Sequence, residues 1–248
     1  MNLGIDNKIA VVTGGAKGIG QRYAKRLAEE GADVAIADIL SPEETQALVR
    51  AAGRECFVHP CNVASEPEVQ AFAQAVLQRF GRVDILINNA GIYPTAPFLD
   101  ISFQDWETVM SVNVGSAFLT TKAFVPDMKT RAWGRIVNIA SGTVVKPPAT
   151  MAHYVTSKAA IVGFTRALAT ELGDWGITVN CIAPGLTATR TVLDGPQGQW
   201  LENRAANQAI KRTEQPDDLV GTMAFLVSDD AAFVTGQTIL VNGGASFL

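Results

Sequence analysis

A tyrosine and a lysine four residues apart, Tyr154 and Lys158 in the segment HYVTSKAA, could carry out acid–base chemistry. The helical pattern of this segment predicts that both side chains lie on one face of a helix. A nearby ammonium group favours the phenolate and lowers the pKa of a phenol from about 10 toward the range of an acid–base catalyst. Surface helices carry such pairs without any function, so the pair gains meaning only together with other residues.

A second segment, TGGAKGIG, has the composition of a loop that binds phosphate. Gly14, Gly18 and Gly20 lie between a short apolar run and a helical pattern. Glycine allows a tight turn and a close approach of pyrophosphate to the backbone, and the helix start offers free N–H groups. The spacing G-x3-G-x-G differs from that of the commonest dinucleotide loop, and it is not a Walker loop. A tight connection without a ligand is the alternative interpretation.

Asp38 ends the next predicted strand, ADVAIAD. A carboxylate at this position can accept hydrogen bonds from the 2′- and 3′-hydroxyls of a ribose, and it would repel a 2′-phosphate. The alternative role is that of a turn or helix-capping residue. Together with the glycine-rich loop, Asp38 predicts NAD as the cofactor.

The elements that would position these residues alternate along the whole chain. Strand-like apolar runs, most of them separated by helical patterns, lie at 8–14, 32–38, 55–60, 83–91, 134–141, 177–185 and 237–244. They are continuously apolar, as expected of parallel strands covered on both faces. We therefore predict an α/β fold: a single domain, 1–248, with a Rossmann-type, doubly wound, seven-stranded parallel sheet and helices on both faces.

Two segments between the strands need separate mention. The stretch 102–128 has a helical pattern over its whole length, which predicts one long helix. The stretch 186–212 is longer than an ordinary loop and predicts a substrate-binding lid, either mobile or built of inserted helices.

Composition narrows the class of protein. Of the 248 residues, 48% are hydrophobic and 18% charged, which is typical of a well-buried globular protein. The net charge is −4, and no basic stripe indicates nucleic acid as a partner. The first residues lack a signal-peptide pattern, and no apolar run approaches the roughly 18 residues of a membrane span. Three cysteines without a secretion signal predict reduced thiols and a cytoplasmic protein.

Taken together and in order, the motifs resemble those of the short-chain dehydrogenase/reductase family. They are TGGAKGIG, NNAG at 88–91, Asn113 in SVNVGS, Ser141 in NIASG, Tyr154 with Lys158, APG at 183–185 and VNGG at 241–244. Each is weak alone, but all occur at the family's spacings along the whole chain. NNAGIYP and FTRALATELG are similar to segments of NAD-dependent secondary-alcohol dehydrogenases, the 1-phenylethanol and pyridoxal dehydrogenases among them.

The resemblance implies a role for each catalytic position. Tyr154 would be the general acid/base, and Lys158 would hold the nicotinamide ribose and tune Tyr154. Ser141 would hydrogen-bond the substrate oxygen, and Asn113 would keep a long helix kinked and anchor a water leading to Lys158. The substrate would contact Tyr93, Ser141, Val144, Tyr154 and Leu186. NAD would contact Tyr154 and Lys158 and, in addition, Gly14, Lys17, Gly18, Ile19, Gly20, Asp38, Asn62, Val63, Asn89, Ala90, Gly91, Pro184, Gly185, Thr187 and Thr189.

Three positions bear on how closely the family's pattern applies. Asn62 stands where Asp is usual, and its amide oxygen can still accept a hydrogen bond from the adenine. Asn242 in VNGG also stands where Asp is usual, and we expect it to affect only the packing of the C-terminal segment. Lys17 stands where NADP-using members often carry a basic residue. Because a solvated Lys contributes little, we expect Asp38 to dominate the cofactor choice.

The family's pocket segments predict the substrate. Here they are 92–94, 143–145 and 186–201; they are mostly apolar, and no Arg is placed to clamp an anion. We therefore expect an uncharged, cyclic or aromatic secondary alcohol or its ketone, although Lys146 could reach an anionic group. No membrane or nucleic-acid partner is expected. The resemblance implies a homotetramer built partly on the apolar helix 159–172.

Two other functions remain open from the sequence. One is NADPH-dependent reduction of a 3-oxoacyl thioester, which Asp38 opposes. The other is a non-catalytic dinucleotide sensor, which the intact Ser141, Tyr154 and Lys158 oppose.

Two groups of residues could be mistaken for functional ones. Cys56, His59 and Cys61 are not expected to hold a metal, because Cys56 would point away from the other two along a strand and no fourth ligand is near. His153 precedes Tyr154, but adjacent helical positions diverge by about 100°. We therefore expect His153 to be a wall or surface residue.

Overall fold

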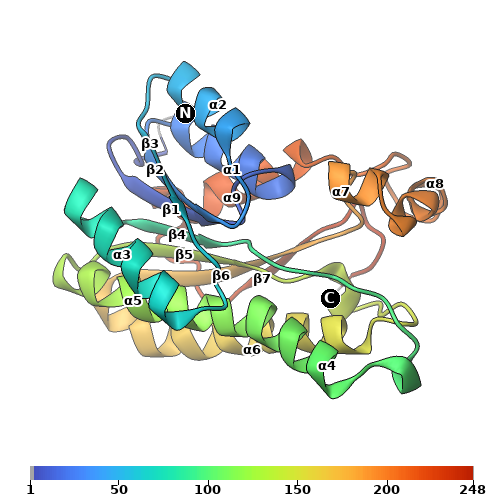
Figure 1. Cartoon of the computed structure of the whole chain (residues 1–248). Coiled ribbons are helices and arrows are strands. Elements are labelled where there is room, and N and C mark those ends of the chain that lie inside the picture. The colour runs from blue at the N-terminus through green and yellow to red at the C-terminus, as the bar shows by residue number, and fades with distance from the viewer. Residues whose placement is uncertain (1–2, 248) are drawn as a thin grey trace.

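Seven parallel strands form one continuous sheet in the computed structural model, which describes residues 3–247 (Figure 1). Their spatial order is β3-β2-β1-β4-β5-β6-β7. Successive strands are added on one side of β1 up to β3, and then on the other side from β4 onward. The strands are β1 (Ile9–Thr13), β2 (Asp33–Asp38), β3 (Cys56–Pro60), β4 (Ile85–Asn88), β5 (Gly134–Ile139), β6 (Ile177–Pro184) and β7 (Thr238–Val241). The predicted fold class is confirmed.

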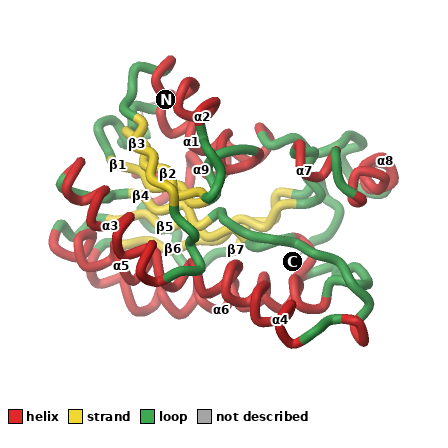
Figure 2. Tube along the Cα trace, viewed as in Figure 1, coloured by secondary structure: helices red, strands yellow, loops and turns green. Residues whose placement is uncertain are grey.

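Helices cover both faces of this sheet (Figures 1 and 2). One layer holds α1 (Gly18–Glu29), α2 (Glu43–Ala51) and α9 (Asp217–Val227), and the other holds α3 (Glu66–Phe80), α5 (Ser116–Thr130) and α6 (Ala152–Leu172). Neighbouring strand residues alternate between the layers: Val12 packs with Leu27 of α1, while Val11 packs with Phe72 of α3. Because side chains of a strand point alternately to the two faces, a run buried on both faces is apolar throughout.

The predicted long helix at 102–128 is interrupted. The chain forms α4 (Phe103–Met110), one π turn (Ser111–Gly115) and then α5. Ser102 and Asp105 form a capping box that starts α4. Asn113 lies buried in the π turn, a widened helical turn that is frequent at functional sites.

The stretch expected to form a lid folds into short helical pieces. They are α7 (Arg190–Leu193), a 3-10 turn (Pro196–Trp200) and α8 (Leu201–Ala206). Figure 2 shows α7 and α8 to one side of the two helical layers. Of the two alternatives, inserted helices are therefore present. In the described part of the chain, no helix is both long and apolar enough to cross a membrane.

Candidate active site

The glycine-rich loop joins β1 to α1 in a conformation that requires glycine. Gly14 and Gly18 have φ of +64° and +61°. A Cβ atom on Gly20 would lie 2.2 Å from the carbonyl oxygen of Gly14, so no side chain fits there. The Asn89 side chain donates to the carbonyl oxygens of Thr13 and Gly14, 3.0 Å away in each case, and ties the loop to the end of β4.

The start of α1 has no side-chain cap. Its N-cap residue, Lys17, makes no side-chain hydrogen bond to the helix. The first N–H groups of a helix have no partner within the helix, so they remain available to a pyrophosphate. The tight glycine turn and this uncapped start fit the predicted dinucleotide.

Asp38 is held in place at the end of β2. One carboxylate oxygen accepts from the backbone N–H of Ala16 and the other from that of Leu40, at 2.9 Å each. Lys17 is exposed and forms no salt bridge with Asp38 within residues 3–247. After β3, the Asn62 side-chain oxygen already accepts from the Ala64 N–H, and Val63 is buried.

The three predicted catalytic side chains come together at the ends of β5 and α6. The Lys158 Nζ is buried, donates to the Ile139 carbonyl oxygen at 2.8 Å, and lies 5.8 Å from the centre of the Tyr154 ring. Ser141 follows β5, and its hydroxyl is hydrogen-bonded to the Tyr154 side chain. The one-face geometry predicted for Tyr154 and Lys158 is therefore present.

The protonation of this group differs from the sequence-based expectation. Burial raises the pKa of the Tyr154 phenol, and the hydrogen bond with Ser141 acts in the opposite direction. Burial lowers the pKa of the Lys158 ammonium to about 8. The pKa of the phenol thus lies above its ordinary value, whereas the sequence predicts a lowered one, because burial removes the hydration that stabilises the phenolate.

Asn113 supports the site from the π turn. Its side chain forms two hydrogen bonds with the backbone of Ile92, at 2.8 and 2.9 Å. It also donates to the Ser157 hydroxyl at 2.9 Å, next to Lys158 in α6. Asn113 therefore joins the loop after β4 to the helix that carries Tyr154 and Lys158.

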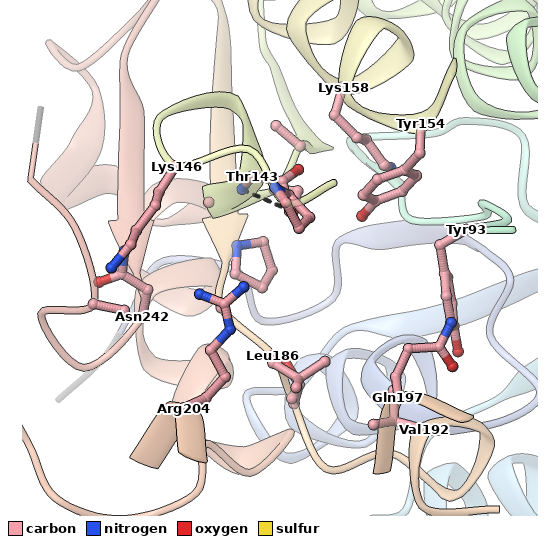
Figure 3. A pocket seen from close by; sticks show the side chains of 18 of the residues that line it. Tyr93, Thr143, Lys146, Tyr154, Lys158, Leu186, Val192, Gln197, Arg204 and Asn242 are labelled. Atoms are coloured by element: carbon pink, nitrogen blue, oxygen red, sulfur yellow. Dashed lines mark hydrogen bonds between the residues drawn. The ribbon is translucent and has the colours of Figure 1, made fainter. Parts of the chain in front are cut away.

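A cavity of about 230 Å³ lies over these residues (Figure 3). The predicted residues that line it are Ile19, Asn89, Gly91, Tyr93, Ser141, Tyr154, Lys158, Pro184, Gly185, Leu186, Thr187 and Thr189. Predicted residues outside its lining are Gly14, Lys17, Gly18, Gly20, Asp38, Asn62, Val63, Ala90, Asn113 and Val144. Val144 was expected to contact the substrate, but its neighbours Thr143 and Lys146 face the cavity instead.

Val192, Gln197 and Trp200 also line the cavity, and they fall within the predicted pocket segment 186–201. The lining residues outside every predicted pocket segment include Arg204 and Gln208, and Asn242, Ala245 and Ser246 near the C-terminus. The expectation that no Arg is placed to meet an anion is wrong, because Arg204 lines the cavity. The polar sequence around Arg204 gave no sign that α8 turns this residue inward.

Glu214 is a further residue that the sequence did not indicate. It is buried, accepts a hydrogen bond of 2.7 Å from the Thr187 hydroxyl, and accepts another of 3.1 Å from the Gly185 N–H. Burial raises the pKa of its carboxyl group to about 7. Glu214 thereby fixes the segment that follows β6.

Other titratable groups lie away from the cavity. His153 is buried and is not part of the lining. Cys56, Cys61 and Cys181 are free and buried. Across residues 3–247, no group of three or more His, Cys, Asp or Glu side chains could hold a metal ion.

Comparison with known proteins agrees with this geometry. The family model described as enoyl-(acyl carrier protein) reductase matches residues 14–246. The (2S)-[(R)-hydroxy(phenyl)methyl]succinyl-CoA dehydrogenase subunit BbsD of Thauera aromatica is 40% identical, over 98% of both chains. The 3-oxoacyl-[acyl-carrier-protein] reductase FabG of Staphylococcus epidermidis is 39% identical, over 96% of this chain and 98% of that one.

A solved structure extends the similarity to three dimensions. The crystal structure of an NAD⁺-bound xylitol dehydrogenase matches with a TM-score of 0.88 and 34% identity, over 97% of this chain and 99% of that one. The family match covers almost the whole chain, as do both relatives. The chain is therefore an oxidoreductase of the short-chain dehydrogenase/reductase family.

Proposed function

We propose that the protein is an NAD-dependent oxidoreductase that transfers hydride between the nicotinamide and a secondary alcohol or its ketone. The observation that carries the proposal is the meeting of Ser141, Tyr154 and Lys158 at one cavity. This set can polarise a carbonyl oxygen and move a proton at it without a metal. Bound NAD would supply the hydride acceptor, and the protein would position the substrate against it.

Each catalytic residue has a distinct proposed role. In its phenolate form Tyr154 takes the proton of the alcohol, and in its phenol form it gives a proton to the ketone oxygen, while the Ser141 hydroxyl hydrogen-bonds the same substrate oxygen. Lys158 holds the nicotinamide ribose and keeps a positive charge near the phenol. The raised pKa of Tyr154 favours the protonated form at neutral pH, which suits the donation of a proton to a ketone. Asn113 acts as a positioning residue, because it anchors the turn of α6 next to Lys158.

The choice of NAD rests on Asp38. Its carboxylate is fixed by two backbone N–H groups at the end of β2, where the family resemblance puts the adenosine ribose, and it would repel a 2′-phosphate there. Like charges in close contact at an effective dielectric constant near 20 cost on the order of several kcal/mol. The solvated Lys17 offers about 0–1 kcal/mol in return.

The reacting end of the substrate is proposed to be cyclic or aromatic. The Tyr93 ring stands edge-on to the Tyr154 ring, with centroids 6.4 Å apart, and Leu186 and Val192 add apolar surface to the cavity. The relative from Thauera is named for a substrate whose hydroxyl-bearing carbon also carries a phenyl group. This similarity supports an aromatic secondary alcohol.

We further propose a cytoplasmic homotetramer. The outward side of α6 exposes small residues such as Gly163, with Phe164 partly covered, and Phe118 of α5 is 49% exposed. Replacing Phe164 with Glu would bury an unpaired charge in such an interface and should give smaller species on sedimentation. A wild-type chain that is already monomeric at micromolar concentration contradicts the tetramer.

A panel of alcohols and ketones, followed at about 340 nm with NAD(H) and NADP(H), tests the function. We expect turnover of cyclic or aromatic secondary alcohols with NAD. The similarity to FabG makes reduction of 3-oxoacyl thioesters with NADPH the second candidate, and preferential turnover of such thioesters would support it. Cofactor binding without turnover of any substrate would instead indicate a dinucleotide sensor.

A further inference from the structure

Two cationic side chains, Lys146 and Arg204, line two cavities at once. Lys146 follows the 3-10 turn after β5, and Arg204 belongs to α8, far away in the sequence. Both line the cavity over Tyr154, and both also line a second cavity bounded by Pro148, Trp200, Asn203 and Asn207. Figure 3 shows their side chains reaching toward the same space from opposite sides. They therefore mark the junction of the two cavities.

The lining of the main cavity is cationic, although the chain as a whole is acidic. Among the described residues the lining includes Lys146, Lys158 and Arg204 but no Asp or Glu. The net charge of the chain is −4, so the positive charge of the lining is a local property of the cavity. A cleft lined by one sign of charge concentrates ligands of the opposite sign.

Neither Lys146 nor Arg204 is paired with an acidic side chain of the residues that the structure describes. Within residues 3–247, neither Lys146 nor Arg204 takes part in a salt bridge, although Arg204 is half-buried. By contrast, Arg212 in the loop before α9 is paired with Asp218. A guanidinium group offers a planar fork of donors that fits a carboxylate or a phosphate.

Asn242 contributes an uncharged side chain to the lining of the main cavity. It lines the same cavity as Lys146 and Arg204. Its amide nitrogen donates to the Ser246 hydroxyl at 3.0 Å, and its oxygen accepts from the Gly244 N–H at 3.0 Å. An Asp at this position would add a carboxylate to the lining that Lys146 and Arg204 share. Asn242 thus affects the charge of the cavity as well as the packing of the C-terminal segment.

We propose that Lys146 and Arg204 bind an anionic group of the substrate, a carboxylate or a phosphate, at the end remote from the reacting carbon. This inference rests on the proposed function of the same cavity and narrows its substrate class. The reacting end is apolar and lies against Tyr93 and Leu186, and the anionic end reaches the junction of the two cavities. The expectation of an uncharged substrate is replaced by that of an amphipathic one.

Binding of matched probes tests this inference independently of turnover. Calorimetry would compare 4-acetylbenzoate with its methyl ester as the carboxylate arm. Acetoacetyl-coenzyme A and the acetoacetyl thioester of N-acetylcysteamine form the phosphate arm. We expect at least one anionic probe to bind about tenfold more tightly than its neutral partner, as charge-assisted contacts in a partly buried site allow. Arg204→Gln should reduce this ratio by roughly five- to tenfold, and the more exposed Lys146→Gln by roughly threefold.

The lid offers a matched control. Lys211→Gln removes a charge of the same sign from the same segment, but Lys211 is exposed, donates to the Ala206 carbonyl oxygen, and lies outside both linings. Its probe ratios should match those of the wild type. Equal binding of charged and neutral probes in both arms, or an equal loss in the Lys211 variant, overturns the anion site. The proposed function fails separately, if neither charged nor neutral alcohols are oxidised.

Discussion

The catalytic frame, formed by β5, the π turn and α6, and the proposed lid, residues 186–212, are built in different ways. Tyr154 and Lys158 lie on α6, and Ser141 follows β5. Buried hydrogen bonds join Lys158 to the Ile139 carbonyl oxygen of β5 and the adjacent Ser157 to Asn113 of the π turn. The lid has only short helical pieces and leaves Leu193, Trp200 and Ile210 41–58% exposed. The Tyr93 hydroxyl connects the two regions by side-chain hydrogen bonds to Thr189 and Thr191.

We infer from this difference that one region carries out the proton transfer and the other selects the substrate. Groups that move protons must be held in one geometry, and buried hydrogen bonds to rigid elements do this. Groups that choose a substrate can lie on short, exposed pieces, since changes there leave the sheet intact. Substitutions in the frame should therefore affect the chemistry or the cofactor, and substitutions in the lid should affect substrate affinity.

The largest effect is expected for Tyr154→Phe. Loss of the hydroxyl removes the proposed acid/base, so turnover should fall by at least ~10²-fold. NAD affinity, measured by calorimetry, should stay close to that of the wild type, because the ring and Lys158 remain. Near-normal turnover in this variant would show that Tyr154 is not the catalyst.

The next effect concerns the cofactor. Asp38→Ser removes the charge opposed to a 2′-phosphate and should shift the ratio of kcat/KM for NAD and NADP by about tenfold or more toward NADP, equal to about 1.4 kcal/mol. Lys17→Ala should shift the ratio the other way. Steady-state kinetics with both cofactors measure the two shifts, and an unchanged ratio in the Asp38 variant would contradict its role.

A lid substitution should behave differently. Trp200 lines both cavities, so Trp200→Ala should raise KM for an aromatic alcohol by roughly three- to tenfold, the range of a lost apolar contact of about 1 kcal/mol. The value of kcat should change much less. A fall in kcat as large as that of Tyr154→Phe would erase the distinction between the frame and the lid.

The smallest effect is on stability. The raised pKa of Glu214 means that the folded chain holds a proton between about pH 4.5 and 7 that the unfolded chain has released, so stability falls as pH rises through this window. Glu214→Gln should reduce the difference in Tm between pH 5 and pH 7 by a few degrees, since each kcal/mol of unfolding free energy corresponds to roughly 2–4 °C. Thermal unfolding at pH 5 and 7 measures it. The exposed Glu202→Gln is the control and should keep the wild-type slope.

Features set by local sequence patterns could be predicted, and features set by contacts distant in the sequence could not. The strands, the glycine-rich loop and the pair Tyr154 and Lys158 follow from local patterns, since apolar runs and helical spacing act over a few residues. Arg204 and Glu214 were missed because their positions depend on residues distant in the sequence: Arg204 lines the same cavity as Lys146, and Glu214 accepts a hydrogen bond from Thr187. Their polar surroundings also match those of solvated residues. The helical pattern around Asn113 is unbroken, so the interruption at the π turn could not be predicted from that pattern; only the family resemblance implied a kink at Asn113.

The ratio of kcat/KM for NAD and NADP in the unmodified protein tests the central claim most directly. The claim is that Asp38 sets the choice of cofactor, and that Ser141, Tyr154 and Lys158 carry out the chemistry. It predicts oxidation of a secondary alcohol with a preference for NAD of at least ~10-fold, or about 1.4 kcal/mol. Equal or better efficiency with NADP would contradict it, because Asp38 would then not govern the site.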